Sequence, residues 1–502
     1  MNKKIYITLL IGAFFISMIS SCSDDFLEVQ PEGKPLESAY YQNQDEAFAG
    51  LISVYDLLRK NSGGFENMIT MMNAGSDDHY AGGGGATDGV GIQSFSNYTQ
   101  NSNTIPPSFW NDYYQGVFRA NVLLQKLPDV PMDETLKTRF VAETKALRAL
   151  YYFNLVIMFK NIPLVLEPLT PANMYEQVQA NPGDVYAQIV KDLTEAIPDL
   201  PATVPAAEKG RLNKGAAQAL LGKVYLYDGK KSLAAAQFAE VNGTPGQTNQ
   251  YGNKLLTDYN DLWAVANRFN AESILETSHS SVGSSYWGNW GSSADEGNTV
   301  NVMVGPRGYV KIGSDAPDLP SGWSFSVITQ DLYDFMKDDP RFESTVLDIK
   351  AMKEAGKVNY TEGYQNTGYF LNKFTPRISD VSTGTGDAVL NYKQNTYIIR
   401  LADTYLMEAE ALGATGARAQ ALLDAVRARV GLPSVPVSME AIKAERRREL
   451  AGEGFRFFDL VRWGDASAKL GPRGFVAGKN EIFPIPYKEL ENTKLVQNPN
   501  YN

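Results

Sequence analysis

The chain has 502 residues, of which 43% are hydrophobic, and a formal net charge of −11. That much apolar content can bury a large core, so composition excludes a disordered protein. The acidic balance, without a long run of Lys and Arg, excludes nucleic acid and anionic membrane surfaces as partners.

The N-terminus has the pattern of a lipoprotein export signal. Lys3 and Lys4 precede an apolar run from Ile5 to Ile19 that is too short and wrongly flanked for a membrane span. The only cysteine, Cys22, follows small residues at the expected cleavage point and resembles the bacterial lipobox; the alternative is a buried free thiol. We therefore predict a signal peptide over residues 1–21, lipidation of Cys22 and membrane attachment through that acyl anchor.

Helical periodicity accounts for most of the chain outside two polar regions. The predicted helices span 45–59, 110–127, 143–159, 184–197, 213–227, 232–241, 396–412, 417–430 and a last segment within 444–465. The fold is thus expected to be mainly α-helical, as one domain over residues 22–502. Its helical core is placed at about 36–60, 108–275 and 391–470, and its loop-rich regions at about 61–107 and 277–390.

One pair of predicted helices has the spacing of a tetratricopeptide hairpin. Leu221, Gly222, Tyr225, Ala234 and Phe238 follow that pattern, in which a small residue lets two antiparallel helices approach and aromatic side chains fill the gap. A second hairpin is predicted over 396–430, but its spacing departs from the consensus, so an ordinary amphipathic hairpin is equally compatible with it.

The motif YWGNWG, at residues 286–291, places two tryptophans among glycine and asparagine in the second polar region. A core strand would surround Trp287 and Trp290 with β-branched residues, and a core helix would not tolerate Gly288 and Gly291 so close together. The motif therefore predicts a loop whose aromatic rings either pack locally or meet a ligand.

The residues that most often carry chemistry form no catalytic or metal-binding pattern. His79 and His279 have no ligand spacing around them, and Gly82–Gly91 lacks the lysine and helix context of a phosphate loop. Asp77 and Asp78 could form a glycosidase pair, but adjacent carboxylates more often bind hydroxyls or cap a turn. We predict no catalytic residue, no metal and no cofactor.

The strongest motif is AERRRELAGEGFRFFDLVRWGD, at residues 444–465. Glu445, Arg448, Glu449 and Glu453 have the three- and four-residue spacing of helical ion pairs, and Gly454 is expected to end the helix. The interleaved aromatic residues predict a partly buried, structural ion-pair network rather than a solvated charged face.

These residues, with others, resemble the RagB/SusD family of Bacteroidetes outer-membrane lipoproteins. The resemblance covers nearly the whole mature chain, beginning with the acidic tag SDDFL at 23–27, which is similar to surface-export tags. The motifs that carry it are LRALYYFNLVIMFKNIPLV (147–165), ALLGKVYLYDG (219–229), YIIRLADTYLMEAEAL (397–412), ERRRELAGEGFRFFDLVRWG (445–464), FPIPYKEL (483–490) and QNPNY (497–501).

The resemblance implies a tetratricopeptide-like helical scaffold with long irregular loops, located at the cell surface on the outer membrane. Family members act as lids on a TonB-dependent transporter, capturing an oligosaccharide or polysaccharide and delivering it inward. Family ligand sites are built from loops that correspond here to residues 76–113 and 280–325. The ligand-binding candidates are Asp77, Asp78, Tyr80, Tyr98, Tyr286, Trp287, Trp290, Arg307, Tyr309 and Trp323. Trp110 and Trp463 are assigned to the core.

Three other functions are compatible with this sequence. A peptide-capturing member of the same family would use the loops on backbone amides. A tetratricopeptide-type scaffold would bind protein tails on helical faces, and a surface glycosidase would require an acid/base pair that the sequence does not identify.

Overall fold

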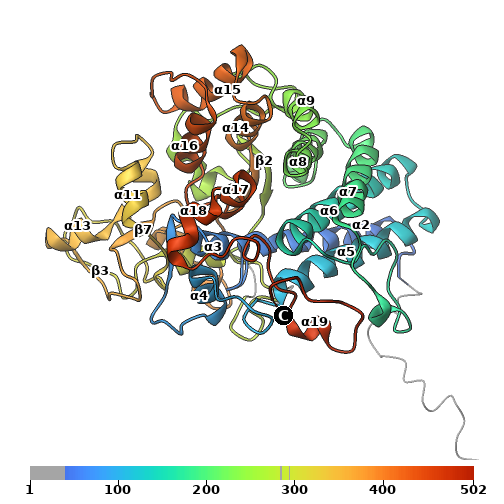
Figure 1. Cartoon of the computed structure of the whole chain (residues 1–502), viewed down its shortest axis with the longest axis horizontal. Coiled ribbons are helices and arrows are strands. Elements are labelled where there is room, and N and C mark those ends of the chain that lie inside the picture. The colour runs from blue at the N-terminus through green and yellow to red at the C-terminus, as the bar shows by residue number, and fades with distance from the viewer. Residues whose placement is uncertain (1–39, 283–284, 293, 502) are drawn as a thin grey trace, which may run out of the picture.

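The computed structural model describes residues 40–282, 285–292 and 294–501. Helices dominate, which confirms the predicted fold class (Figure 1). The predicted signal peptide and Cys22 lie outside the described residues. Within those residues, the structure contains no helix that is both long and apolar enough to cross a membrane.

The helical body is built from hairpins that pack side by side. Its helices are α2 (Gln44–Tyr55), α5 (Ser108–Lys126), α6 (Glu134–Phe159), α7 (Pro182–Ala196), α8 (Lys214–Tyr227), α9 (Lys231–Asn242), α14 (Leu401–Ala411), α15 (Gly416–Arg429), α16 (Met439–Glu449) and α17 (Arg456–Trp463). In Figure 1 the yellow and orange segment containing α11 and α13 projects from this body on one side.

The two predicted loop regions contain short elements that the sequence analysis did not predict. The short helices there are α3 (Met68–Ala74), α4 (Val90–Asn97), α10 (Thr299–Val304), α11 (Gln330–Met336), α12 (Phe342–Thr345) and α13 (Ile349–Glu354). Two more short helices, α18 (Ala466–Leu470) and α19 (Tyr487–Leu490), lie outside these regions, toward the C-terminus. The helix α3 begins where the Asn67 side chain accepts the N–H of Thr70, a cap that the surrounding polar residues obscure in the sequence.

Within the described ranges, four two-stranded antiparallel sheets complete the fold: β1–β4, β2–β8, β3–β6 and β5–β7. The strands are β1 (His79–Gly82), β2 (Ser273–Thr277), β3 (Val310–Lys311), β4 (Phe325–Ile328), β5 (Val346–Asp348), β6 (Val358–Asn359), β7 (Tyr369–Leu371) and β8 (Thr396–Arg400). The prediction of a helix at 396–412 is therefore wrong over its first five residues. The run TYIIR, residues 396–400, pairs with β2 as a strand before α14 begins.

The first hairpin has the close helix contact that its sequence predicts. A Cβ atom placed on Gly222 in α8 would lie 2.8 Å from the ring of Phe238 in α9, so only glycine lets the ring lie against that helix. The prediction of a small residue opposite an aromatic side chain is confirmed there. The helix α6 begins at Glu134, earlier than expected, because the Asp133 side chain accepts the N–H of Leu136.

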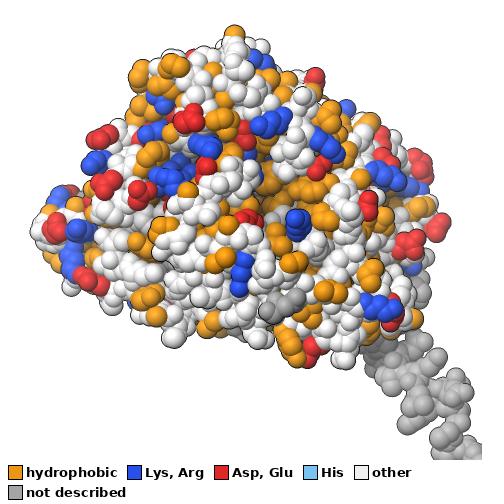
Figure 2. Space-filling model, in the orientation of Figure 1, with side chains coloured by type: hydrophobic (Ala, Val, Ile, Leu, Met, Phe, Trp, Pro, Cys, Tyr) orange, Lys and Arg blue, Asp and Glu red, His pale blue; other side chains and the backbone are white. Residues whose placement is uncertain are grey.

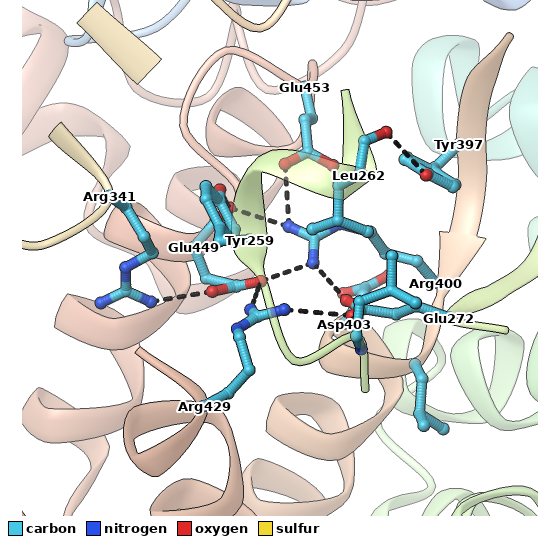
Figure 3. Close-up of polar contacts among 12 residues, drawn as sticks. Tyr259, Leu262, Glu272, Arg341, Tyr397, Arg400, Asp403, Arg429, Glu449 and Glu453 are labelled. Atoms are coloured by element: carbon cyan, nitrogen blue, oxygen red, sulfur yellow. Dashed lines mark hydrogen bonds and ion pairs between the residues drawn. The ribbon is translucent and has the colours of Figure 1, made fainter. Parts of the chain in front are cut away.

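A network of buried charges joins the helical body to the loop-rich part. Glu449 lies at its centre and is fully buried, with oxygen atoms 2.5 Å from Arg400 and 2.8 Å from Arg341, and it also pairs with Arg429 (Figure 3). Burial raises the pKa of the Glu449 carboxyl, but the three guanidinium groups outweigh it and hold that pKa well below its ordinary value.

The network differs from the predicted one in its partners. Glu445 contacts Arg341 at 2.7 Å and Arg427 at 2.8 Å, and neither arginine belongs to α16. Arg448 lies 3.5 Å from Asp339, which precedes α12. The buried, structural role of the motif is thus observed, but the ions pair across the fold because they face the core rather than a helix surface.

On the face shown in Figure 2, acidic and basic side chains are intermingled and form no continuous basic stripe.

We expect Glu449→Gln to lower the free energy of unfolding by about 3–5 kcal/mol, because each of three buried guanidinium groups loses one of its carboxylate partners. Urea unfolding at neutral pH measures this loss. The exposed Glu362, which pairs with Lys353, provides the matched control, and Glu362→Gln should change stability by less than about 0.5 kcal/mol.

The same variant tests how the free energy of unfolding depends on pH. Because the folded pKa of Glu449 is lowered, its stabilising contribution is complete above the ordinary glutamate pKa of about 4.3 and is lost as the pH falls below that value. Glu449→Gln should therefore flatten the acid side of the stability profile. An unchanged acid limb would show that the network does not stabilise the fold.

Candidate functional site

Three tryptophans from two loops come together at the protein surface, and we call Trp287, Trp290 and Trp323 the aromatic platform. The rings of Trp287 and Trp323 stack with centroids 6.0 Å apart and planes 24° apart. Trp290 stands perpendicular to both, at 5.4 and 5.6 Å. Trp287 is 54% exposed, whereas Trp290 and Trp323 are half-buried.

Trp290 supports this platform from the protein side. Its indole N–H donates to the hydroxyl of Thr299 at 3.1 Å, and its ring meets Phe65 edge-on at 6.0 Å. Thr299 is fully buried at the start of α10. The two tryptophans of YWGNWG therefore have different positions: Trp290 is anchored inward, and Trp287 lies above it with much of its surface in solvent.

Hydrogen bonds to the backbone hold the loop that carries these two rings. The N–H of Trp287 donates to Asp387 at 3.0 Å, and that of Gly291 donates to Asp295 at 2.9 Å. Gly291 has a φ of +77°, a conformation that favours glycine. Sequence analysis missed Asp387, since it lies 100 residues from its partner and belongs to no recognisable motif.

Arg307 connects the platform to the glycine-rich loop. Its guanidinium donates to the carbonyl oxygen of Trp323 at 3.0 Å and to the Asp88 carboxylate at 3.3 Å. The same carboxylate oxygen accepts the N–H of Gly84 at 2.7 Å. The loop around Gly84 is thus held beside Trp323, and Asp88 is a second residue of this surface that the sequence analysis missed.

Two other candidates from this region differ in their surroundings. Tyr286 is about half exposed and lies next to Trp287 in the chain. Tyr309 is half-buried in a separate apolar cluster with Ala316 and Leu319, and its hydroxyl donates to the carbonyl of Pro317 at 2.6 Å. Tyr286 therefore stays a candidate for ligand contact, whereas Tyr309 has a structural position.

The carboxylates of the first region form ion pairs with the C-terminal motif. Asp77 accepts two hydrogen bonds from Arg456, both of 2.8 Å, and Asp78 is 1% exposed and lies 2.7 Å from Arg447. Burial raises the pKa of Asp77, but the Arg456 and Arg447 guanidinium groups outweigh it and lower that pKa overall. Both carboxylates are therefore paired with arginines inside the fold and form no part of the proposed site.

The tyrosines of that region also have structural surroundings. Tyr98 is only 6% exposed, and its hydroxyl donates to the carbonyl oxygen of Gly75 at 2.5 Å. Burial raises the pKa of the Tyr98 hydroxyl. Tyr80 is half-buried with the Arg473 guanidinium 5.0 Å from its ring centroid. Neither tyrosine enters the proposed site.

Both histidines are buried and have ordinary hydrogen-bond partners. His279 contacts the hydroxyl of Ser62 at 2.7 Å, and His79 contacts the carbonyl of Ser326 at 2.9 Å. Burial lowers the pKa of both imidazoles, that of His279 to about 4, so both are neutral at pH 7. In the part of the chain that the structure describes, no three His, Cys, Asp or Glu side chains are grouped to hold a metal ion.

The remaining two tryptophan assignments have different outcomes. Trp110 is 3% exposed and lies in the core, as predicted. Trp463 is half-buried, and the charged ends of Lys443 and Arg462 lie 5.2 and 4.7 Å from its ring centroid. Its assignment to the core is therefore wrong, because it ends α17 where the helix meets solvent.

Two protein-family models match the chain. The model described as "SusD family" matches residues 244–474, and the model described as "Starch-binding associating with outer membrane" matches residues 25–226. Together they span both the helical body and the loops that carry the platform.

Individual relatives match over nearly the whole chain. A solved structure of a laminarin-binding SusD-like protein is 64% identical, covers 92% of this chain and 100% of its own, and superposes with a TM-score of 0.91. The surface glycan-binding protein A of Bacteroides fluxus is 28% identical, with coverages of 91% and 100% and a TM-score of 0.80. The SusD-like protein P25 of Formosa agariphila is 24% identical over 96% of each chain. The chain therefore belongs to the SusD family, a family of glycan-binding proteins that are not enzymes.

Proposed function

We propose that this protein captures an oligosaccharide or polysaccharide on the aromatic platform at the cell surface. The observation that carries the proposal is the ring of Trp287, which is half exposed while stacked on Trp323 and braced from below by Trp290. Pyranose rings have flat C–H faces that pack on indole rings, and a braced ring loses little conformational entropy when ligand binds.

Polar groups suited to sugar hydroxyls lie beside these rings. Arg307 contacts the backbone carbonyl of Trp323 and pairs with Asp88, and the side chains of both charged residues are more than one-third exposed. Tyr286 adds an exposed hydroxyl-bearing ring on the Trp287 side. An apolar stacking surface with a few placed donors and acceptors is the usual composition of a small-molecule site, and it orients a sugar without requiring catalytic groups.

Laminarin is the glycan that we propose as ligand. The support is the relative at 64% identity, which is named as laminarin-binding and matches over its whole length. Carbohydrate specificity depends on loops, and the high identity makes a shared ligand the simplest hypothesis. A response to peptides but to no glycan would instead support the peptide-capturing alternative.

Delivery of the glycan to a TonB-dependent transporter is the second part of the proposal. The family description of starch binding in association with the outer membrane supports this location. A lipid at Cys22 would tether the protein beside the transporter, and the body would act as its lid. Closure driven by ligand requires that the glycan favour the closed state over the open one.

Calorimetric titration of the chain from Ser23 onward tests the ligand. We expect saturable binding of laminarin and laminarihexaose with quenching of tryptophan fluorescence, and no comparable response to xylan, mannan or unrelated peptides. Accumulation of reducing sugar during the titration would support the glycosidase alternative.

Substitutions of the platform test the site. Trp287→Ala should weaken laminarin binding about tenfold or more, because it removes the exposed stacking surface. Trp290→Ala should also weaken binding, through loss of the support beneath Trp287.

The matched control is Tyr175→Ala, because Tyr175 is 51% exposed in a short 3-10 helix, Met174–Glu176, outside the platform. This variant should bind laminarin like the native chain. Far-ultraviolet circular dichroism should be unchanged in all three variants. If Trp287→Ala bound laminarin with native affinity, the site assignment would be disproved. The glycan would then have to bind to another surface of the protein.

The anchor is tested by Cys22→Ala in the full chain. Because the thiol would carry the lipid, we expect the variant to lose its acyl label and to leave the outer-membrane fraction. A variant that remained acylated and membrane-bound would contradict the lipoprotein assignment.

A further inference from the structure

Carboxylates outnumber cations at the aromatic platform. Asp387 and Asp295 accept backbone N–H groups of the loop that carries Trp287, and Glu296 follows Asp295 directly. Partial burial raises the pKa of Glu296, and the neighbouring Asp56 and Asp295 carboxylates add to that increase. Asp295 and Glu296 on this loop, with Asp387 and Asp56 packed against it, therefore bring several carboxylates close together, and any further anion placed there would experience their repulsion.

Among the residues that the structure describes, two arginines contact this surface, and both are paired with carboxylates. Arg59 donates to the carbonyl of Gly291 at 3.2 Å, but its side chain is buried and lies 3.6 Å from Asp56 and 3.9 Å from Asp112. Arg59 therefore holds the backbone of the loop from inside the protein. Its charge is balanced before any ligand arrives.

Arg307 is the cation that a ligand on the platform would meet. Its side chain is 36% exposed, and that of Asp88 is 41% exposed, with 3.3 Å between guanidinium and carboxylate. The contact is a single hydrogen bond, in which Nη2 of Arg307 donates to one oxygen of Asp88. Asp88 is also held in place by the N–H of Gly84. The carboxylate thus stays beside the arginine and neutralises it where it faces solvent.

From this arrangement we propose that the platform selects uncharged glycans and discriminates against glycans that carry carboxylate or sulfate groups, with Asp88 as the residue that determines this selectivity. The inference rests on the proposed function, because it concerns the same site. An anionic substituent needs a free cation to replace its hydration shell, and here the accessible cation, Arg307, is already paired with Asp88. Neutral hydroxyls, in contrast, can use both members of the Asp88–Arg307 pair at once, one as acceptor and one as donor.

A matched pair of ligands tests the selectivity. Laminarin and partially carboxymethylated laminarin share one backbone and differ in charge, so the ratio of their dissociation constants isolates the electrostatic effect. We expect the native protein to bind the neutral form at least about tenfold more tightly at low ionic strength and to lose part of this preference as salt is added.

Asp88→Asn keeps an oxygen for the N–H of Gly84 but removes the charge that neutralises Arg307. We expect it to shift the ratio toward the carboxymethylated ligand by about three- to tenfold. Arg307→Gln removes the positive charge instead of the negative one and should therefore increase the preference for the neutral ligand. The control is Asp334→Asn, an exposed carboxylate on α11 that pairs with Lys337; it makes the same change in net charge and should leave the ratio at its native value.

The outcomes separate this inference from the proposed function. If the native chain binds neither ligand, the proposed function fails, and the question of selectivity does not arise at this site. If it binds both with equal affinity, or if Asp88→Asn and Asp334→Asn have the same effect on the ratio, glycan binding stands and the inference is overturned.

Discussion

The buried ion pairs around Glu449 are the constraint on which the rest of the structure depends. Its carboxylate is surrounded by Arg341, Arg400 and Arg429, which come from three different parts of the chain. A charge in a fully buried position is tolerated only while its partners remain, so the segments that supply them cannot separate without exposing or stranding an ion. The strand β8, the helices α15 and α16 and the segment before α12 are thereby held as one body.

The same C-terminal motif also holds the loops that surround the candidate site. Arg447 and Arg456, which flank the turn between α16 and α17, reach Asp78 and Asp77 at the far end of the sequence. These contacts fix the segment that leads into β1 and the glycine-rich loop, where Asp88 meets Arg307. A platform built from irregular loops can therefore be rigid, and a rigid surface loses less entropy when it binds a sugar.

Local sequence patterns predicted the helical body well because its hairpins bury one face at helical spacing. The close contact at Gly222 is visible in the sequence for that reason. The strand β8 was missed because its pairing with β2 is non-local. Trp287 and Trp290 could be placed on a loop from their glycine neighbours, whereas the partners Asp387 and Asp88 could not be found, since each is distant in sequence and isolated. Asp77 was predicted to contact ligand because it lies in a region that corresponds to family ligand loops. Only the fold shows that its carboxylate is paired with Arg456.

The central claim is that a glycan lies on the exposed face of Trp287. A crystal structure of the protein with bound laminarihexaose tests it most directly. We expect a pyranose ring stacked on Trp287 within van der Waals distance, with hydroxyls hydrogen-bonded to Arg307 and Asp88. A sugar bound instead in a groove between helices of the body, with the platform bare, would contradict it.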